Sequence, residues 1–220
     1  MISKYWNVLL NILYPPKCPY CKTLVQQHGA WCPSCLSVIL AVREINVMEH
    51  RLKSLNSCRV VCEYTGGLKR IIHDMKFRRQ KKYGIYLIWL LTNSKLPHDL
   101  SIIDYVIPVP LHTDRLQERG YNQTEVIFKE WSRKEKLLWM PDLLVRGKHT
   151  IPQWELTLAK RRENIKGAFL ITRPEMVKDK HILLVDDIIT TGITLDECAK
   201  VLKKSGAASV HGLAVASGAR

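Results

Sequence analysis

The chain has 220 residues, 46% of them hydrophobic, and a formal net charge of +14 from 34 Lys and Arg against 20 Asp and Glu. This length suits one medium domain with a small appendage, and the apolar content excludes a disordered chain. The positive charge favours polyanionic partners, such as phosphate compounds, nucleic acid or an anionic membrane, although a basic surface without any partner remains an alternative.

An apolar run at residues 5–14 opens the chain and is interrupted by Asn7 and Asn11. It leads into Pro15 and Pro16 without a small-residue cleavage site, which argues against a signal peptide and favours a cytoplasmic protein. We expect an amphipathic helix docked on the protein, with a membrane-surface helix as the alternative. No stretch reaches the roughly 18 consecutive apolar residues that a transmembrane span requires.

Four of the seven cysteines have the C-x2-C-x10-C-x2-C spacing of a metal site. Each C-x2-C pair brings two thiolates to one ion from a tight turn, so two pairs complete the tetrahedron of a structural Zn²⁺. Two disulfides are the main alternative but need an oxidising compartment, and an iron–sulfur cluster or a redox-active pair remains open. The expected zinc ligands are Cys18, Cys21, Cys32 and Cys35.

We interpret residues 1–50 as a leader helix, the cysteine module and a linker helix, and residues 51–220 as one α/β domain. Strands alternate with helices in that domain, which predicts a parallel sheet with helices on its faces and ligands beyond the carboxyl ends of the strands. Helices are expected from residue 66, at 83–91, at 122–136 and from residue 194, and strands at 57–65, 105–110, 143–146, 168–172, 182–185 and 209–216.

The helix that begins at residue 66 and the segment after it are rich in basic side chains. This charge pattern, with Phe77 and other aromatic residues nearby, suits the phosphates and bases of single-stranded nucleic acid. A solvated basic face over a buried aromatic core is the alternative. The candidate contacts with nucleic acid are Lys69, Arg70, Lys76, Arg78 and Arg79.

Two further segments carry arginines that suit an anion. Pro108 and Pro110 fix a loop at a strand end, and Arg115 and Arg119 follow at i and i+4, where a helix would place them on one face. Arginine binds pyrophosphate oxygens with forked donors, but solvated surface arginines are the alternative. The basic segment from Gln153 to residue 169 is expected to close as a lid over a polyanion, or to form an exposed basic helix.

The most informative segment lies at residues 182–194 and reads ILLVDDIITTGIT. An apolar strand stops at Asp186 and Asp187, and a small-residue turn then leads into a helix, for which Thr194 and Glu197 predict a capping box. Free N–H groups at a helix start bind anions, while carboxylates suit hydroxyls and divalent metals. The segment therefore predicts a sugar-phosphate site.

The same segment resembles the phosphoribosyl-pyrophosphate (PRPP) motif of type I phosphoribosyltransferases. The resemblance implies that the turn holds the 5′-phosphate of PRPP, that Asp186 and Asp187 contact the ribose hydroxyls as the catalytic acidic pair, and that Mg²⁺ accompanies the ligand. It also implies a pyrophosphate site beside the loop after residue 108. The expected PRPP-binding residues are Thr190, Thr191, Gly192, Ile193, Thr194, Val109, Pro110, Leu111, Arg115, Arg119 and Arg162.

Taken in order, the four-cysteine module, GGLKRIIHDMKF, VIPVPLH, RLQERGYNQ, RENIKGAF and the PRPP motif resemble the ComF/GntX family. The resemblance implies a zinc finger fused to a type I phosphoribosyltransferase fold. It further implies a role in natural transformation, with single-stranded DNA in the bacterial cytoplasm and a DNA-uptake helicase or recombination mediator as partner. The acceptor of a transferase reaction stays open, and so does the alternative of a non-catalytic DNA-binding adaptor or PRPP sensor.

Overall fold

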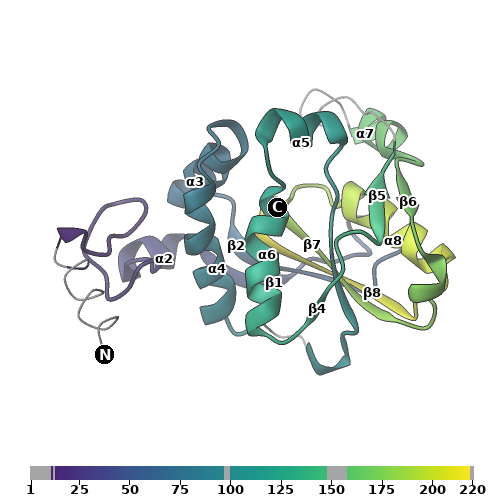
Figure 1. The fold of residues 1–220 in the computed structure, drawn as a ribbon, viewed down its shortest axis with the longest axis horizontal. Coiled ribbons are helices and arrows are strands. Elements are labelled where there is room, and N and C mark those ends of the chain that lie inside the picture. The colour runs from purple at the N-terminus through teal and green to yellow at the C-terminus, as the bar shows by residue number, and fades with distance from the viewer. Residues whose placement is uncertain (1–10, 12, 97–99, 148–157, 219–220) are drawn as a thin grey trace.

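A six-stranded sheet in the order β1-β2-β8-β7-β3-β4 forms the centre of the computed structural model, which describes residues 11, 13–96, 100–147 and 158–218 (Figure 1). Only β1 is antiparallel to its neighbour, so the predicted parallel α/β sheet is confirmed. The strands are β1 (Leu40–Glu44), β2 (Ser57–Glu63), β3 (Tyr105–Pro108), β4 (Leu138–Trp139), β7 (His181–Ile189) and β8 (Ser209–Ser217).

Helices cover both faces of the sheet, because successive side chains of its central strands point to opposite faces. In β7, Leu183 and Val185 pack with buried residues of α3, α4 and α6, while Ile182 and Leu184 pack with those of α8. The expected helices are confirmed as α3 (Gly66–Phe77), α4 (Gly84–Asn93), α6 (Gln123–Lys134) and α8 (Ile193–Lys204).

The two short strands expected at 143–146 and 168–172 are present, but they do not join the parallel sheet. β5 (Leu144–Arg146) and β6 (Phe169–Ile171) pair with each other in a separate antiparallel sheet. Their buried Leu144 and Phe169 pack in the same core cluster as α8, so this pair of strands covers that side of the main sheet. The chain between the two strands contains α7 (Leu158–Ile165).

The prediction of a linker helix before residue 50 is wrong. The helix α2 (Pro33–Ile39) lies inside the cysteine module, and β1 follows it at once. Ion pairs between the strands, Arg43 with Glu63 at 2.9 Å and Arg59 with Glu44 at 3.0 Å, stabilise the antiparallel edge. Most of the apolar run at 5–14 lies outside the described residues.

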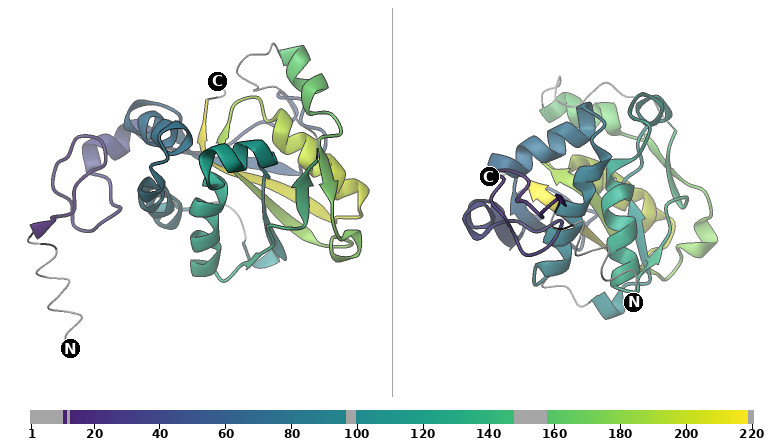
Figure 2. Two further views of the ribbon diagram at one scale, coloured as in Figure 1. Left: turned by 45° about the horizontal axis from the view of Figure 1, so that its top comes forward. Right: turned by 60° about the vertical axis from the view of Figure 1, so that its left-hand side comes forward.

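The sequence pattern did not predict several short elements. These are α5 (Thr113–Arg119), β4 and the 3₁₀ turns η1 (Lys81–Tyr83), η2 (Leu100–Ile102) and η4 (Pro174–Met176). Among the described helices, none combines the length and apolar character needed to cross a membrane. The cysteine module lies at one end of the molecule, against α3 and α4 (Figure 2).

Candidate functional site

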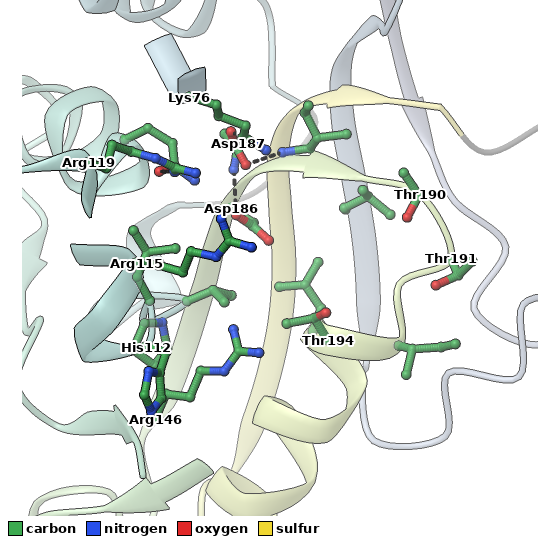
Figure 3. Close-up of a pocket in the computed structure, with 18 of the residues that line it drawn as sticks. Lys76, His112, Arg115, Arg119, Arg146, Asp186, Asp187, Thr190, Thr191 and Thr194 are labelled. Carbon is green, nitrogen blue, oxygen red and sulfur yellow. Dashed lines mark hydrogen bonds and ion pairs between the residues drawn. The ribbon is translucent and has the colours of Figure 1, made fainter. Parts of the chain in front are cut away.

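A pocket of about 660 Å³ opens at the carboxyl ends of the central strands (Figure 3). β3 ends there beside Val185 of β7, since the Val109 N–H donates to the Val185 carbonyl at 2.9 Å. The loop after β3, helix α5 and the turn after β7 surround the space. Every residue that the sequence predicts for PRPP lines this pocket except Arg162.

The acidic pair is more deeply built into the sheet than expected, because β7 continues past it to Ile189. Asp187 is only 2% exposed, and its Oδ2 lies 2.8 Å from the ammonium of Lys76. Asp186 is half-buried and accepts hydrogen bonds on Oδ1 from the Thr124 hydroxyl at 3.2 Å and the Asp187 N–H at 2.8 Å. The pair is therefore held by residues of α3 and α6 as well as by its own strand.

Burial and the negative charge of Asp187 raise the pKa of Asp186 to about 8. Asp186 therefore takes up a proton more readily than a solvated carboxyl does, because ionising it places a second negative charge beside Asp187 in a poorly solvated site. An arriving cationic or hydroxyl-bearing ligand favours the ionised pair. The arrangement therefore suits a ligand that brings positive charge or hydrogen-bond donors to this point.

The turn after β7 departs from the predicted capping box. Helix α8 begins at Ile193, directly after Gly192, which has a left-handed conformation with φ of 72°. The Glu197 carboxylate instead accepts from the Gly167 N–H at 3.1 Å and pairs with Lys200 at 3.1 Å. Gly192 has no side chain that could cap α8, and the first turn of this helix lines the pocket, where helix N–H groups favour an anion.

Replacing Gly192 with alanine is expected to distort this turn and weaken anion binding. A Cβ there would lie 2.6 Å from Cδ1 of buried Leu52, in addition to the strain of the left-handed backbone. Together these effects cost about 2 kcal/mol or more. Gly167→Ala is the matched control, because it has φ of 66° with no atom within 4 Å of its Cβ. Equal thermal midpoints for the two variants would contradict the steric argument.

Cations line the side of the pocket that faces the turn. Arg119 donates to the Gln123 side chain, and burial lowers the pKa of this guanidinium while the charge of Asp187 raises it. Arg115 pairs with Glu118 at 3.0 Å. Figure 3 shows both arginines across the acidic pair from Thr190 and Thr191. The pocket therefore offers positive charge on one side of the carboxylates and helix N–H groups on the other.

Among the residues that shape this site without having been assigned to it from the sequence are Lys76, Arg146 and Thr124. Lys76 was grouped with the nucleic-acid contacts, but its side chain is 21% exposed and pairs with Asp187. Arg146 lines the pocket from β5, and buried Thr124 at the start of α6 contacts Asp186 from behind the pocket lining. Of these three residues, only Lys76 could have been recognised from its local sequence, because it lies next to the apolar stripe of its helix. The other two depend on how distant segments pack.

The structure describes only part of the segment that was expected to form a lid. Gln153 lies outside the described residues, and Arg162 is exposed on α7, away from the pocket lining. The charge of Arg162 acts instead on Asp196 of α8, whose pKa burial raises and this arginine lowers. His112, the nearest imidazole to the pocket loop, caps α5 by accepting from the Asp114 N–H at 3.3 Å.

The four module cysteines converge as their spacing predicts. Their sulfur atoms all lie within 4.8 Å of one another, and Cys35 donates its N–H to the Cys32 sulfur at 3.4 Å. Four thiol ligands around one point fit a structural Zn²⁺ better than two disulfides do. The three other cysteines, Cys58, Cys62 and Cys198, are buried free thiols.

The basic residues predicted for nucleic acid do not all share one role. Lys69 and Arg70 are exposed on α3, and Arg78 is exposed but lies 3.5 Å from Asp74. The Arg79 guanidinium donates to the Glu118 carbonyl at 2.6 Å, which ties the end of α3 to α5. The aromatic residues Tyr86 and Trp89 pack against the core, as the alternative interpretation expected.

Comparisons with known proteins agree with this architecture. Residues 114–219 match the phosphoribosyl transferase domain, and residues 9–45 match the double zinc ribbon domain. Four of the seven cysteines fall in the second range, which is enough for one zinc site. The chain thus combines a phosphoribosyltransferase-type domain with an N-terminal zinc ribbon.

The similar proteins narrow this class. The chain is 30% identical over 201 residues to "Competence protein F" of Haemophilus influenzae, and the aligned region covers 89% of this chain and 82% of the relative. It is 32% identical over 155 residues to "DNA utilization protein YhgH" of Escherichia coli strain K12, covering 69% and 67%. "Competence protein ComFC" of Bacillus subtilis is 27% identical over 222 residues, covering 93% and 86%. The chain belongs to the ComF family.

Proposed function

We propose that the chain binds PRPP and acts as a phosphoribosyltransferase whose acceptor is still to be found. The observation that carries the proposal is that the acidic pair, the start of α8 and the arginines of α5 line one pocket. A sugar with phosphate groups at both ends needs hydroxyl acceptors in the middle and anion sites on either side. The carboxylates of the acidic pair suit the hydroxyl groups in the middle, and the start of α8 and the arginines of α5 suit the phosphate groups on either side.

In this proposal the 5′-phosphate lies on the turn from Thr190 to Thr194, and Asp186 and Asp187 accept hydrogen bonds from the ribose hydroxyls. The pyrophosphate lies near the loop that begins at Val109, where Arg115 and Arg119 offset its charge. The pocket carboxylates would suit a hard cation such as the Mg²⁺ that accompanies PRPP, which would offset part of the negative charge of the leaving group. Stabilising the departing pyrophosphate would then provide most of the catalysis.

We further propose a role in natural transformation, on single-stranded DNA in the cytoplasm. The support is the naming of two relatives as competence proteins and of a third as a DNA utilization protein. A helicase of DNA uptake or a recombination mediator is the kind of protein partner that this role requires. The proposed domain division places residues 1–50 in the zinc module and residues 51–220 in the transferase-like domain.

Calorimetric titration of the zinc-loaded protein with PRPP and Mg²⁺ tests the pocket assignment. We expect saturable heat with one site per chain, and inorganic pyrophosphate should compete. A protein that retains zinc and gives no heat, and no displacement of a fluorescent competitor, would overturn PRPP binding and the enzyme with it.

A non-catalytic DNA-binding adaptor or PRPP sensor is the second candidate, and the exposed basic residues of α3 and η1 favour it. Lys69, Arg70, Lys81 and Lys82 are all exposed, and a formal charge of +14 attracts polyanions. Binding to single-stranded DNA should weaken steeply with added salt, because phosphate contacts release counterions. Replacing Lys69 and Arg70 with methionine should reduce the salt slope by about 1 to 2. A salt-independent affinity would count against this surface.

A further inference from the structure

Among the residues that the structure describes, Lys76 places its ammonium in direct contact with the acidic pair. Its Nζ lies 2.8 Å from Oδ2 of Asp187, whose side chain is almost completely buried. The other oxygen, Oδ1, accepts from the Ile188 N–H at 3.0 Å. A buried carboxylate without a counter-charge is costly, so this ion pair fixes both the charge and the direction of Asp187.

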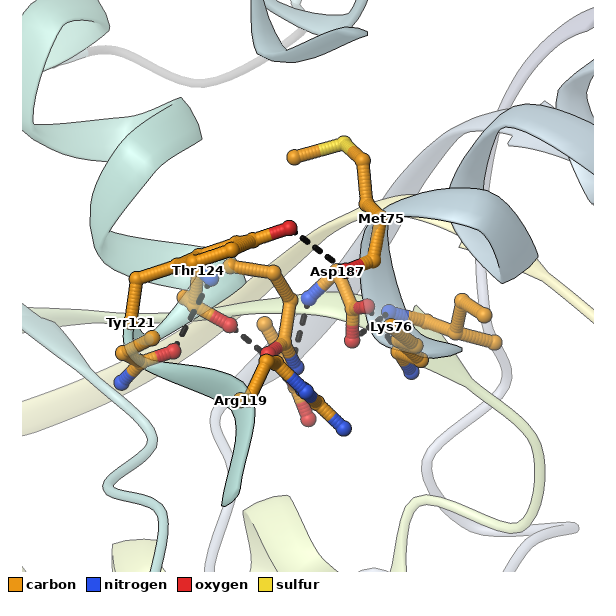
Figure 4. A network of polar contacts seen from close by, with 10 residues as sticks. Met75, Lys76, Arg119, Tyr121, Thr124 and Asp187 are labelled. Carbon is orange, nitrogen blue, oxygen red and sulfur yellow. Dashed lines mark hydrogen bonds and ion pairs between the residues drawn. The ribbon is translucent and has the colours of Figure 1, made fainter. Parts of the chain in front are cut away.

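The end of α3 is itself held in place by the segment that enters α6 (Figure 4). The Tyr121 hydroxyl donates to the Met75 carbonyl at 2.5 Å, one residue before Lys76. The bond of Arg79 to the Glu118 carbonyl is a second tie between α3 and the same region. Lys76 therefore reaches Asp187 from a helix end whose position is set by contacts outside α3.

The segment that anchors α3 also supplies the partner of the other carboxylate. Thr124 donates to Asp186, and Asn122 orders this turn by accepting from the Thr124 N–H at 2.9 Å and donating to the Val109 carbonyl at 3.3 Å. Two stretches that look independent in the sequence, GGLKRIIHDMKF and RLQERGYNQ, thus form one frame around the acidic pair. The frame fixes where a ligand's hydroxyl groups would meet the two carboxylates.

We propose that Lys76 is a positioning residue of the pocket, which holds the Asp187 carboxylate in place for the vicinal hydroxyls of a ribose phosphate. This inference rests on the proposed function and assigns Lys76 to the ribose part of the ligand. Lys76 is then no longer a candidate contact with nucleic acid. Lys76 acts through Asp187, in contrast to the arginines of α5, which face the anionic end.

Two probes with Mg²⁺ separate the ribose contribution from the anion contribution. PRPP carries both parts, whereas inorganic pyrophosphate has no hydroxyls of a sugar. We expect Lys76→Met to weaken PRPP binding roughly ten- to a hundredfold, because hydrogen bonds to a charged group lose their orientation. Binding of pyrophosphate, measured by competition, should change by less than about twofold. Lys129→Met, which deletes an exposed lysine–carboxylate pair on α6, should leave both affinities unchanged.

Conservative variants distinguish positioning from a general loss of folding. Lys76→Arg should restore much of the PRPP affinity, and Tyr121→Phe should weaken it to a smaller extent than Lys76→Met, because only the anchor of α3 is lost. In a double-mutant cycle, Lys76→Met should have little further effect in the Asp187→Asn background, since its partner charge is already absent. Zinc content and the thermal midpoint are measured for each variant.

The outcomes separate this inference from the proposed function. Wild-type protein that does not bind PRPP would overturn the proposed function itself. Wild-type binding with an unchanged affinity in Lys76→Met would overturn only the role of Lys76. An equal loss for PRPP and pyrophosphate would place Lys76 at the anionic end of the ligand and so contradict positioning through Asp187, as would additive effects in the cycle.

Discussion

The double variant Asp186→Asn/Asp187→Asn is expected to lose PRPP binding by roughly a hundredfold to ten thousandfold while it retains zinc. Each carboxylate is expected to accept a charge-assisted hydrogen bond from a ribose hydroxyl, and each such bond contributes about 1.5–3 kcal/mol. Asparagine keeps the shape of the side chain, so the sheet around β7 should stay intact. Calorimetry with PRPP and Mg²⁺ measures the loss, and elemental analysis measures the zinc.

Two comparisons show whether this loss belongs to the site. Asp142→Asn removes an exposed carboxylate outside the pocket lining and should bind PRPP as the wild type does. Asp187→Asn alone leaves Lys76 without its partner, so it should also lower the thermal midpoint more than Asp186→Asn does. A double variant that still binds PRPP with near wild-type affinity would show that the ligand does not use the acidic pair.

Local patterns were sufficient for the four central strands of the sheet, β2, β8, β7 and β3, and for the centre of the pocket. The strand at β7, the turn at Gly192 and the loop after Pro108 are each encoded by a short run of residues. Parallel strands place their carboxyl ends at one edge, so the acidic pair and the loop had to meet. The cysteine spacing alone was likewise enough to predict four converging thiols, because each C-x2-C pair brings its two sulfur atoms together from a tight turn.

The rest of the site depends on contacts between distant segments. Lys76 meets Asp187 across 111 positions of sequence (187 − 76), and Thr124 meets Asp186 across 62. The capping box failed for a similar reason, because the Glu197 carboxylate has a tertiary partner in the Gly167 N–H. A helix-period pattern identifies a buried stripe, but it does not say which polar residue beside the stripe faces a pocket.

The linker helix failed because strand pairing overrode the local preference of residues 40–44. Leu40–Glu44 has no strong alternation, and its burial is intermediate at most positions. What makes it a strand is the free edge of β2 and the ion pairs across it, such as Arg43 with Glu63. Edge strands of this kind are poorly visible in a single sequence, since their stability comes from the partner.

Replacing Cys18 and Cys21 with serine is expected to abolish zinc binding and unfold the N-terminal module. Few apolar contacts hold a module of this size together, so the metal supplies much of its folding free energy. Elemental analysis should show loss of zinc, and limited proteolysis should cut within residues 9–45 while the remainder resists. His28→Ala is the control, because His28 lies exposed between the cysteine pairs and is not needed for four-thiolate coordination.

The loss should reach beyond the module, because the module packs on α3 and α4. Trp31 is 4% exposed, and its indole N–H donates to the Tyr86 carbonyl at 3.2 Å. Exposing a large buried side chain to water costs about 1.5–3 kcal/mol, so the thermal midpoint of the whole chain should fall clearly. A variant that loses zinc with an unchanged midpoint would mean that the module contributes nothing to the transferase-like domain.

Helix α3 connects this loss to the pocket. It begins under the ring of Tyr20, where a Cβ on Gly67 would lie 2.4 Å from the ring carbon Cγ, and it ends at the residues that hold Asp187. If the module keeps α3 in position, the zinc-free variant should bind PRPP more weakly than wild type. If the tie from Tyr121 to Met75 is sufficient, PRPP affinity should be unchanged in that variant and should fall only when Tyr121→Phe is added. Calorimetry on the two variants therefore decides which end of α3 sets the position of Lys76.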